Sequence, residues 1–104
     1  MFKKNTVITR GINEKLDIVI ISTLWQLLQT ENDRELDYLQ VFELKNVGTK
    51  EEPMLKIIWS QEEPEYMAQY LLKGIHSDVE KVWVICNGEG TEDEYSTMLL
   101  PEEY

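Results

Sequence analysis

The chain has 104 residues and carries 20 Asp and Glu against 10 Lys and Arg, a formal net charge of −10. Hydrophobic residues make up 42% and aromatic residues 10%, which is enough for a packed core and argues against global disorder. This length fits one domain, so the sequence predicts a single acidic domain over residues 1–104.

Several classes of protein are disfavoured by the same composition. The one cysteine, Cys86, cannot form an internal disulfide or a thiolate zinc cluster. Apolar runs such as Ile18–Ile21 fall far short of the ~20 residues that span a bilayer, and Met1–Asn5 lacks the apolar stretch of a signal peptide. The basic residues are scattered, which disfavours direct binding to nucleic acid or anionic membranes. We therefore expect a cytoplasmic protein.

The first elements are a short strand and a helix. The β-branched run Thr6–Thr9 predicts a strand that ends at Arg10-Gly11. Asn13 is a good helix cap, with a glutamate after it in the first turn, and the predicted helix continues to about Thr30. The run Ile18–Ile21 could also form a buried strand. Helical periodicity through Leu28 favours the helix.

A charged connection, Glu31–Glu35, leads to two predicted strands. Residues Tyr38–Leu44 form the first, and Met54–Ser60, with alternating side chains, forms an antiparallel neighbour. Asn46–Lys50 supplies the turn between them.

A second helix is predicted from Pro64 to Lys73. Proline suits the first helical position, and the surrounding glutamates suit the positive end of the helix dipole. Glu65, Gln69 and Lys73 are spaced by four and would face solvent. Gly74 would then end the helix.

The last part of the chain predicts two more strands. Lys81–Cys86 is apolar on both faces, as in a central strand, and Tyr95–Leu100 ends at a proline. The predicted order is β-α-β-β-α-β-β, an α+β fold with an antiparallel sheet of about five strands and two helices on one face. Such a sheet exposes its other face or buries it in a homodimer.

Four strings of the chain carry a family resemblance: Thr9–Glu14, Leu36–Leu44, Gln61–Tyr66 and Tyr95–Tyr104. Together they resemble a family of small proteins of Gram-positive bacteria classed as domain of unknown function 960. The resemblance implies a cytosolic protein of a family without an assigned activity. It carries over no catalytic residue.

The sequence offers weak candidates for catalysis or metal binding. The acidic loop Glu89–Glu94 could attract a hard cation, but its spacing does not match a calcium loop, and a solvated loop is the simpler interpretation. His76 has Ser77 and Asp78 beside it, and consecutive side chains rarely converge for catalysis. Cys86 ends an apolar strand, where a buried thiol is inert. We predict no cofactor and no metal site, and these residues favour a protein that is not an enzyme.

The aromatic residues are more informative. Tyr and Trp are enriched both in cores and at interfaces, and carboxylates around them would suit a basic protein or peptide. Arg10 could pair with Asp37 or Glu43, or hold a carboxylate or phosphate ligand near a helix N-terminus. The candidate binding residues are Arg10, Trp25, Asp37, Tyr38, Glu43, Tyr66 and Tyr95.

Two classes of function remain open from the sequence. The first is a non-enzymatic protein-binding or regulatory domain with a basic partner, including a variant in which carboxylates imitate a nucleic-acid backbone. The second is an enzyme, or a domain that binds a small ligand or metal, with a pocket between helix and sheet.

Overall fold

A computed structural model of the chain describes residues 1–30 and 35–104. The predicted charged connection Glu31–Glu35 lies, except for its last residue, outside the described residues. The described elements, in chain order, are β1 (Thr6–Ile8), α1 (Arg10–Lys15), α2 (Ile18–Thr30), β2 (Leu39–Asn46), β3 (Met54–Gln61), β4 (Tyr66–Lys73), β5 (Lys81–Asn87), β6 (Tyr95–Leu99) and the 3-10 helix η1 (Pro101–Glu103).

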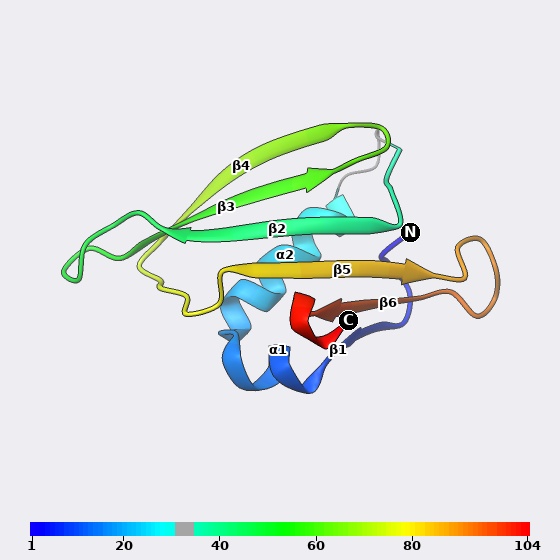
Figure 1. Cartoon of the computed structure of the whole chain (residues 1–104), viewed down its shortest axis with the longest axis horizontal. Helices are drawn as coiled ribbons and strands as arrows, with labels where there is room; N and C mark the ends of the chain where they lie inside the picture. The colour runs from blue at the N-terminus through cyan, green and yellow to red at the C-terminus, as the bar shows by residue number, and fades with distance from the viewer. Residues whose placement is uncertain (31–34) are drawn as a thin grey trace.

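The described strands form one sheet in the order β1-β6-β5-β2-β3-β4 (Figure 1). Neighbours are antiparallel except β1 and β6, which are parallel. The α+β class is confirmed. The predicted sheet of about five antiparallel strands is wrong, because it is a mixed sheet of six strands. The four predicted strands that became β2, β3, β5 and β6 are confirmed within one or two residues.

The second predicted helix is wrong, since residues 66–73 form strand β4. The strand pairs with β3 from Tyr66 opposite Gln61 to Lys73 opposite Met54. Its side chains alternate between half-buried and exposed. Pro64 and the glutamates around it lie in the turn before this strand, and Gly74 follows the strand with φ of 80°.

The first predicted helix is two helices, and it begins earlier than Asn13. Thr9 caps α1, its hydroxyl accepting a hydrogen bond from Ile12 N at 3.4 Å. The helix ends at Lys15, and Leu16 is extended. Asp17 then accepts a hydrogen bond from Val19 N at 2.8 Å, the role of a helix cap. A carboxylate that binds the free amide of Val19 therefore starts α2.

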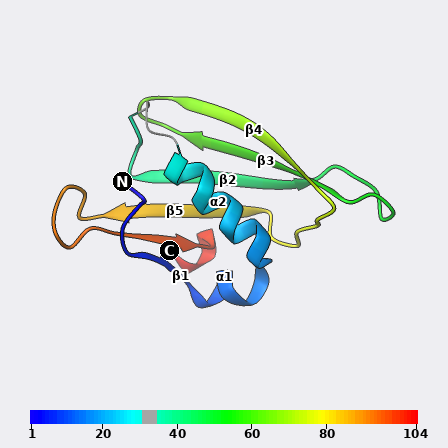
Figure 2. The same cartoon turned by 180° about the vertical axis from the view of Figure 1, so that it is seen from behind.

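The core lies between α2 and one face of the sheet (Figure 2). Ile20, Ile21, Leu24 and Leu28 form the buried stripe of the helix. Every second residue of β2, β3 and β5 is buried under it. Those strand residues are Gln40, Phe42, Leu44, Leu55, Ile57, Trp59, Gln61, Val82, Val84 and Cys86.

Candidate binding surface

On the face of the sheet turned away from α2, the described helix is the short η1, which lies against β5 at one side (Figures 1 and 2). Because side chains alternate along a strand, the residues between the buried ones point to this face. We call this surface the open face and define it by Val7, Leu39, Val41, Glu43, Lys45, Met54, Lys56, Ile58, Ser60, Met67, Gln69, Leu71, Lys73, Lys81, Trp83, Ile85, Asn87, Tyr95, Thr97 and Leu99.

The middle of the open face is apolar and partly exposed. Met67 is 64% exposed and Leu71 59% on β4, and Val7 is 48% exposed on β1. Val41, Ile58 and Ile85 between them are half-buried by their neighbours in the sheet. An apolar surface that extends over several strands marks interaction sites more often than scattered single residues do.

The end of the chain covers one part of this face. Tyr104 lies against Trp83 with ring centroids 5.7 Å apart at an interplanar angle of 66°. The rest of the open face, toward β2, β3 and β4, lies beyond this contact.

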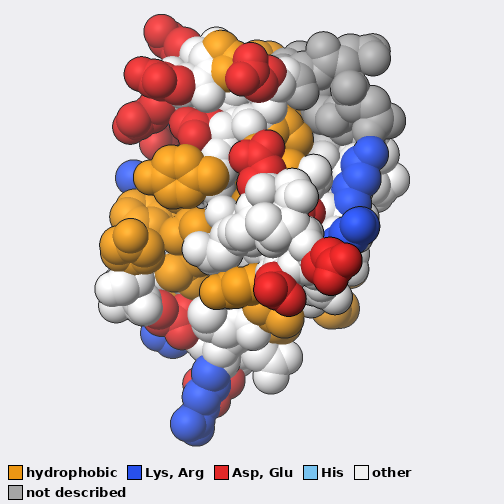
Figure 3. Space-filling view, turned by 90° about the vertical axis from the view of Figure 1, so that its right-hand side faces the viewer, with side chains coloured by type: hydrophobic (Ala, Val, Ile, Leu, Met, Phe, Trp, Pro, Cys, Tyr) orange, Lys and Arg blue, Asp and Glu red, His pale blue; other side chains and the backbone are white. Residues whose placement is uncertain are grey.

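One end of the open face is acidic. The β3–β4 turn contains Glu62, Glu63 and Glu65, all exposed. Figure 3 views this end of the molecule and shows acidic side chains clustered above a group of hydrophobic ones along one side. The carboxylates therefore border the apolar surface.

The acidic turn is held in place by hydrogen bonds. Asp37 Oδ2 accepts from Glu63 N at 3.2 Å, and Gln61 Nε2 donates to the carbonyl oxygen of Pro64 at 2.8 Å. Gln61 is itself buried. A turn fixed in this way presents its glutamates in one arrangement before any partner binds, which lowers the entropy cost of recognition.

A buried polar network extends from that turn into the core. Trp59 Nε1 donates to Gln40 Oε1 at 2.5 Å, and Gln40 Nε2 donates to Gln61 Oε1 at 2.9 Å and to the carbonyl oxygen of Asp37 at 2.7 Å. The Trp59 ring also contacts Tyr66 edge to face at 5.6 Å. Each of these buried amides therefore has partners, as a stable interior requires.

The other end of the open face carries lysines. Lys45 of β2 lies opposite Lys56 of β3, and Lys81 of β5 lies opposite Glu43. Lys45 Nζ is 4.0 Å from Glu43 Oε2. The face is thus basic at one end, apolar in the middle and acidic at the other end.

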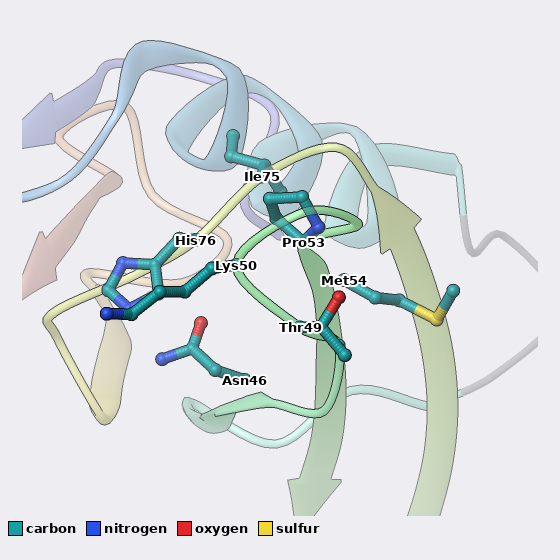
Figure 4. Close-up of a pocket in the computed structure, with 8 residues that line it drawn as sticks. Asn46, Thr49, Lys50, Pro53, Met54, Ile75 and His76 are labelled. Atoms are coloured by element: carbon teal, nitrogen blue, oxygen red, sulfur yellow. The ribbon is translucent and has the colours of Figure 1, made fainter.

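A pocket of about 350 Å³ lies beyond the basic end, between the β2–β3 hairpin and the segment after β4. Figure 4 shows Lys50 and His76 on one side of it and Thr49 and Met54 on the other. It is not the pocket between helix and sheet that the sequence predicted for a ligand or substrate.

The residues beside His76 have structural partners. The Ser77 hydroxyl donates to the carbonyl oxygen of Val79 at 2.8 Å, and the Ser77 backbone bonds with the Asn46 side chain in both directions. His76 Nδ1 lies 3.6 Å from Asp78 Oδ1, and both side chains are exposed. Ser77 is therefore held as part of a turn and not presented to the imidazole as a nucleophile.

Of the seven candidate binding residues, Glu43 and Tyr95 lie on the open face. Tyr38 is 58% exposed in the loop before β2, and Asp37, beside it, fixes the acidic turn. Tyr66 packs on Trp59 at the same end of the sheet, on the helix-covered side. The structure thus gathers Asp37, Tyr38 and Tyr66 near the acidic end.

Arg10 and Trp25 lie elsewhere. Arg10 Nε donates to Glu14 Oε1 at 2.8 Å within α1, so its predicted ion pair with Asp37 or Glu43 is wrong. The helical spacing of four between Arg10 and Glu14 allows this local pair. Trp25 lies on α2, half-buried against the core.

Residues of β4 were missed by the sequence reasoning. Met67 and Leu71 are among its most exposed apolar side chains, and the predicted helix left them off the solvent-facing set Glu65, Gln69 and Lys73. The sequence of residues 66–73 has apolar residues at both alternate sets of positions, so it carries no alternation that would have found them.

The acidic loop between β5 and β6 is ordered by its own contacts. Glu94 is buried and accepts a hydrogen bond from Gly90 N at 3.2 Å. Across residues 1–30 and 35–104, no three His, Cys, Asp or Glu side chains group closely enough to hold a metal ion. In the same part of the chain, no helix has the length and hydrophobicity to cross a membrane.

Comparison with known proteins places the chain in a family. A solved structure, described as the crystal structure of the protein of unknown function from Enterococcus faecalis, has a similar fold with a TM-score of 0.79 at 19% sequence identity, over 99% of this chain and 94% of that one. No curated protein matches the chain. The model of a family described as Staphylococcal protein of unknown function (DUF960) matches residues 5–103, and the chain belongs to that family.

Proposed function

We propose that this protein is a non-enzymatic binding domain whose open face docks a partner protein. The observation that carries the proposal is the apolar surface across β2, β3 and β4, with Ile58 and Val41 at its centre and Met67 and Leu71 at its margin. Apolar area of this kind gains free energy when a partner removes it from water.

The acidic turn supplies specificity in this proposal. Glu62, Glu63 and Glu65 project from a turn that Asp37 and Gln61 hold in place. With a net charge of −10, the protein attracts basic partners over long range. A partner with apolar side chains next to Lys or Arg would match both parts of the surface.

Affinity capture with paired variants tests the proposal. The open face is altered by Ile58→Ser with Leu71→Ser, and the acidic turn by Glu62→Gln, Glu63→Gln and Glu65→Gln together. The control for the turn removes three exposed carboxylates at the opposite end of the sheet, Glu51→Gln, Glu52→Gln and Asp78→Asn.

The expected result is one protein that the wild type and the control retain at low salt and that both test variants lose. If only the open-face variant loses this protein, the glutamates have no role in binding it, and the open face remains the docking surface. Equal retention by every variant would refute the proposal.

The alternative, a small-ligand or enzymatic site, would use the pocket beside His76. It has apolar walls and two cationic or ionisable side chains, Lys50 and His76, which would suit a small anion with an apolar part. This pocket lies at the end of the sheet opposite the acidic turn. Lys50→Ala would therefore abolish binding of a small ligand in the pocket and leave capture of a partner protein by the open face intact.

A further inference from the structure

The outer edge of the sheet at β4 is long and regular. Eight residues pair with β3 without interruption, and no described element lies beyond β4 in the sheet (Figure 1). Proteins usually protect such an edge with a short strand, a proline, a bulge or an inward charge. The opposite edge, β1, has three residues and meets the first condition. β4 contains no proline, and its one charged residue is Lys73 at the end.

The backbone groups at this edge can be assigned from one hydrogen bond. Gly74 N donates to the carbonyl oxygen of Pro53 at 2.7 Å, so the amide of residue 74 points to the β3 side. Antiparallel ladders alternate in this direction residue by residue. The amides and carbonyls of Met67, Gln69, Leu71 and Lys73 therefore point to the free edge.

We propose that this edge binds the same edge of a second copy of the chain, antiparallel, about a two-fold axis through Gln69. Strand pairing requires residues of the same sheet face to stand opposite each other. In this register Gln69 meets the partner's Gln69, Met67 meets the partner's Leu71 and Glu65 meets the partner's Lys73.

Charge and size complementarity favour a second copy as the occupant. The register sets a carboxylate opposite an ammonium group at both ends, and apolar side chains opposite each other between them. On the helix-covered face, the small Ala68 stands opposite the partner's bulky Tyr70. One strand of this sequence is thus complementary to itself, as a two-fold interface demands.

The two sheets would join into one continuous sheet, with both open faces on the same side. This inference does not depend on the partner proposed for the open face, because the paired groups are the backbone edge of β4. The net charge of −10 on each copy opposes association over long range, and salt screens that repulsion. We therefore expect a dimer that is weaker at low ionic strength than at physiological ionic strength.

Sedimentation equilibrium from micromolar to millimolar protein tests the pairing. The wild type should dimerise, and Gln69→Pro should be monomeric, because proline removes an edge donor that makes no bond to β3. Gln69→Thr keeps the donor and should still dimerise. A wild type that stays monomeric throughout, or a dimer that survives in the folded proline variant, would overturn the proposal.

A charge exchange tests the pairing without disturbing the backbone. Glu65→Lys alone sets like charges opposite each other at both ends and should weaken the dimer about tenfold. Adding Lys73→Glu should restore it. If the double variant is no tighter than the single one, Glu65 and Lys73 do not meet across the interface, and the register is wrong.

Thiol crosslinking checks the two-fold position in a Cys86→Ala background. Gln69→Cys stands opposite itself, where the Cα atoms of paired residues are about 5.5 Å apart, within the range of a disulfide. It should give a covalent dimer on mild oxidation. Leu71→Cys stands opposite the partner's Met67 and should not, and the reverse result would exclude this register.

Discussion

The two faces of the sheet are built from the same strands and differ in what covers them. On β3, Ile57 is fully buried beneath α2, and Ile58, the next residue, points to the open face and is half-buried. Ile57 therefore contributes to folding, and folding gains less from Ile58. The proposed docking surface depends on this contrast between the two faces.

Replacing each isoleucine by alanine tests this difference between the two faces. Ile57→Ala leaves a cavity in the core and should lower the free energy of unfolding by about 2–5 kcal/mol. Ile58→Ala should lower it by about 1 kcal/mol or less, since water already reaches this side chain. Denaturant unfolding of both variants checks this, and equal losses would show that the two faces are equally buried in solution.

The buried network gives the next largest expected effect. Gln40→Ala leaves the indole N–H of Trp59 without its acceptor and should cost about 1–3 kcal/mol. Thermal or urea unfolding measures the loss, with Gln26→Ala at an exposed position of α2 as the control. A loss no larger than that of the control would mean that the network adds nothing to stability.

Glu103 gives a smaller, pH-dependent effect at the end of the chain. Its carboxylate accepts hydrogen bonds from the Thr9 hydroxyl at 2.5 Å, from Leu100 N at 2.9 Å and from Gly11 N at 3.1 Å. These bonds, the one from Thr9 foremost, lower the pKa of Glu103. A lowered pKa stabilises the folded state above the pKa of the unfolded carboxyl, and this stability is lost as the pH falls through the folded value.

The stability gap between wild type and Glu103→Gln should therefore be largest near neutral pH and should shrink as the pH falls from about 7 past the ordinary glutamate pKa of about 4.3 and through the lowered pKa of the folded carboxyl. Urea unfolding across that range measures it, with Glu102→Gln as the control. Gly11→Ala should also lower the free energy of unfolding near neutral pH, because a Cβ there would lie 2.7 Å from Glu103 Oε2. A gap that does not change with pH would contradict this role of the carboxylate.

Most strands were predictable from sequence because alternation and β-branched residues are local signals. Residues 54–61 alternate buried and half-buried over the whole strand, as the predicted strand Met54–Ser60 required. The break at Asp17 could also have been found, since aspartate before Ile18 is a helix cap. The helical periodicity of the apolar residues from Leu16 to Leu28 favoured one continuous helix instead.

The error at β4 has a physical cause. Glu65, Gln69 and Lys73 are four apart, and residues at this spacing share a side of a helix and also a side of a strand. Proline followed by glutamates supported the helix. Pairing with β3 decides the outcome, and that is a tertiary effect that overrides local preference.

The candidate surface was only partly predictable. The sequence indicated an uncovered sheet face, and two of the candidate binding residues it named, Glu43 and Tyr95, lie on that face. It could not show that β1 joins the sheet beside β6, since Val7 and Thr97 lie far apart in the chain. It also could not place Met67 and Leu71, because they became surface residues only with the strand.

Site-specific photo-crosslinking tests the central claim most directly. A photoreactive residue at position 58 of the open face is compared with one at Gln26, an exposed position of α2, in cells that express the protein. We predict a specific crosslinked protein at position 58 that is absent at position 26. Crosslinks of equal pattern at the two positions, or none at position 58, would contradict a binding role for the open face.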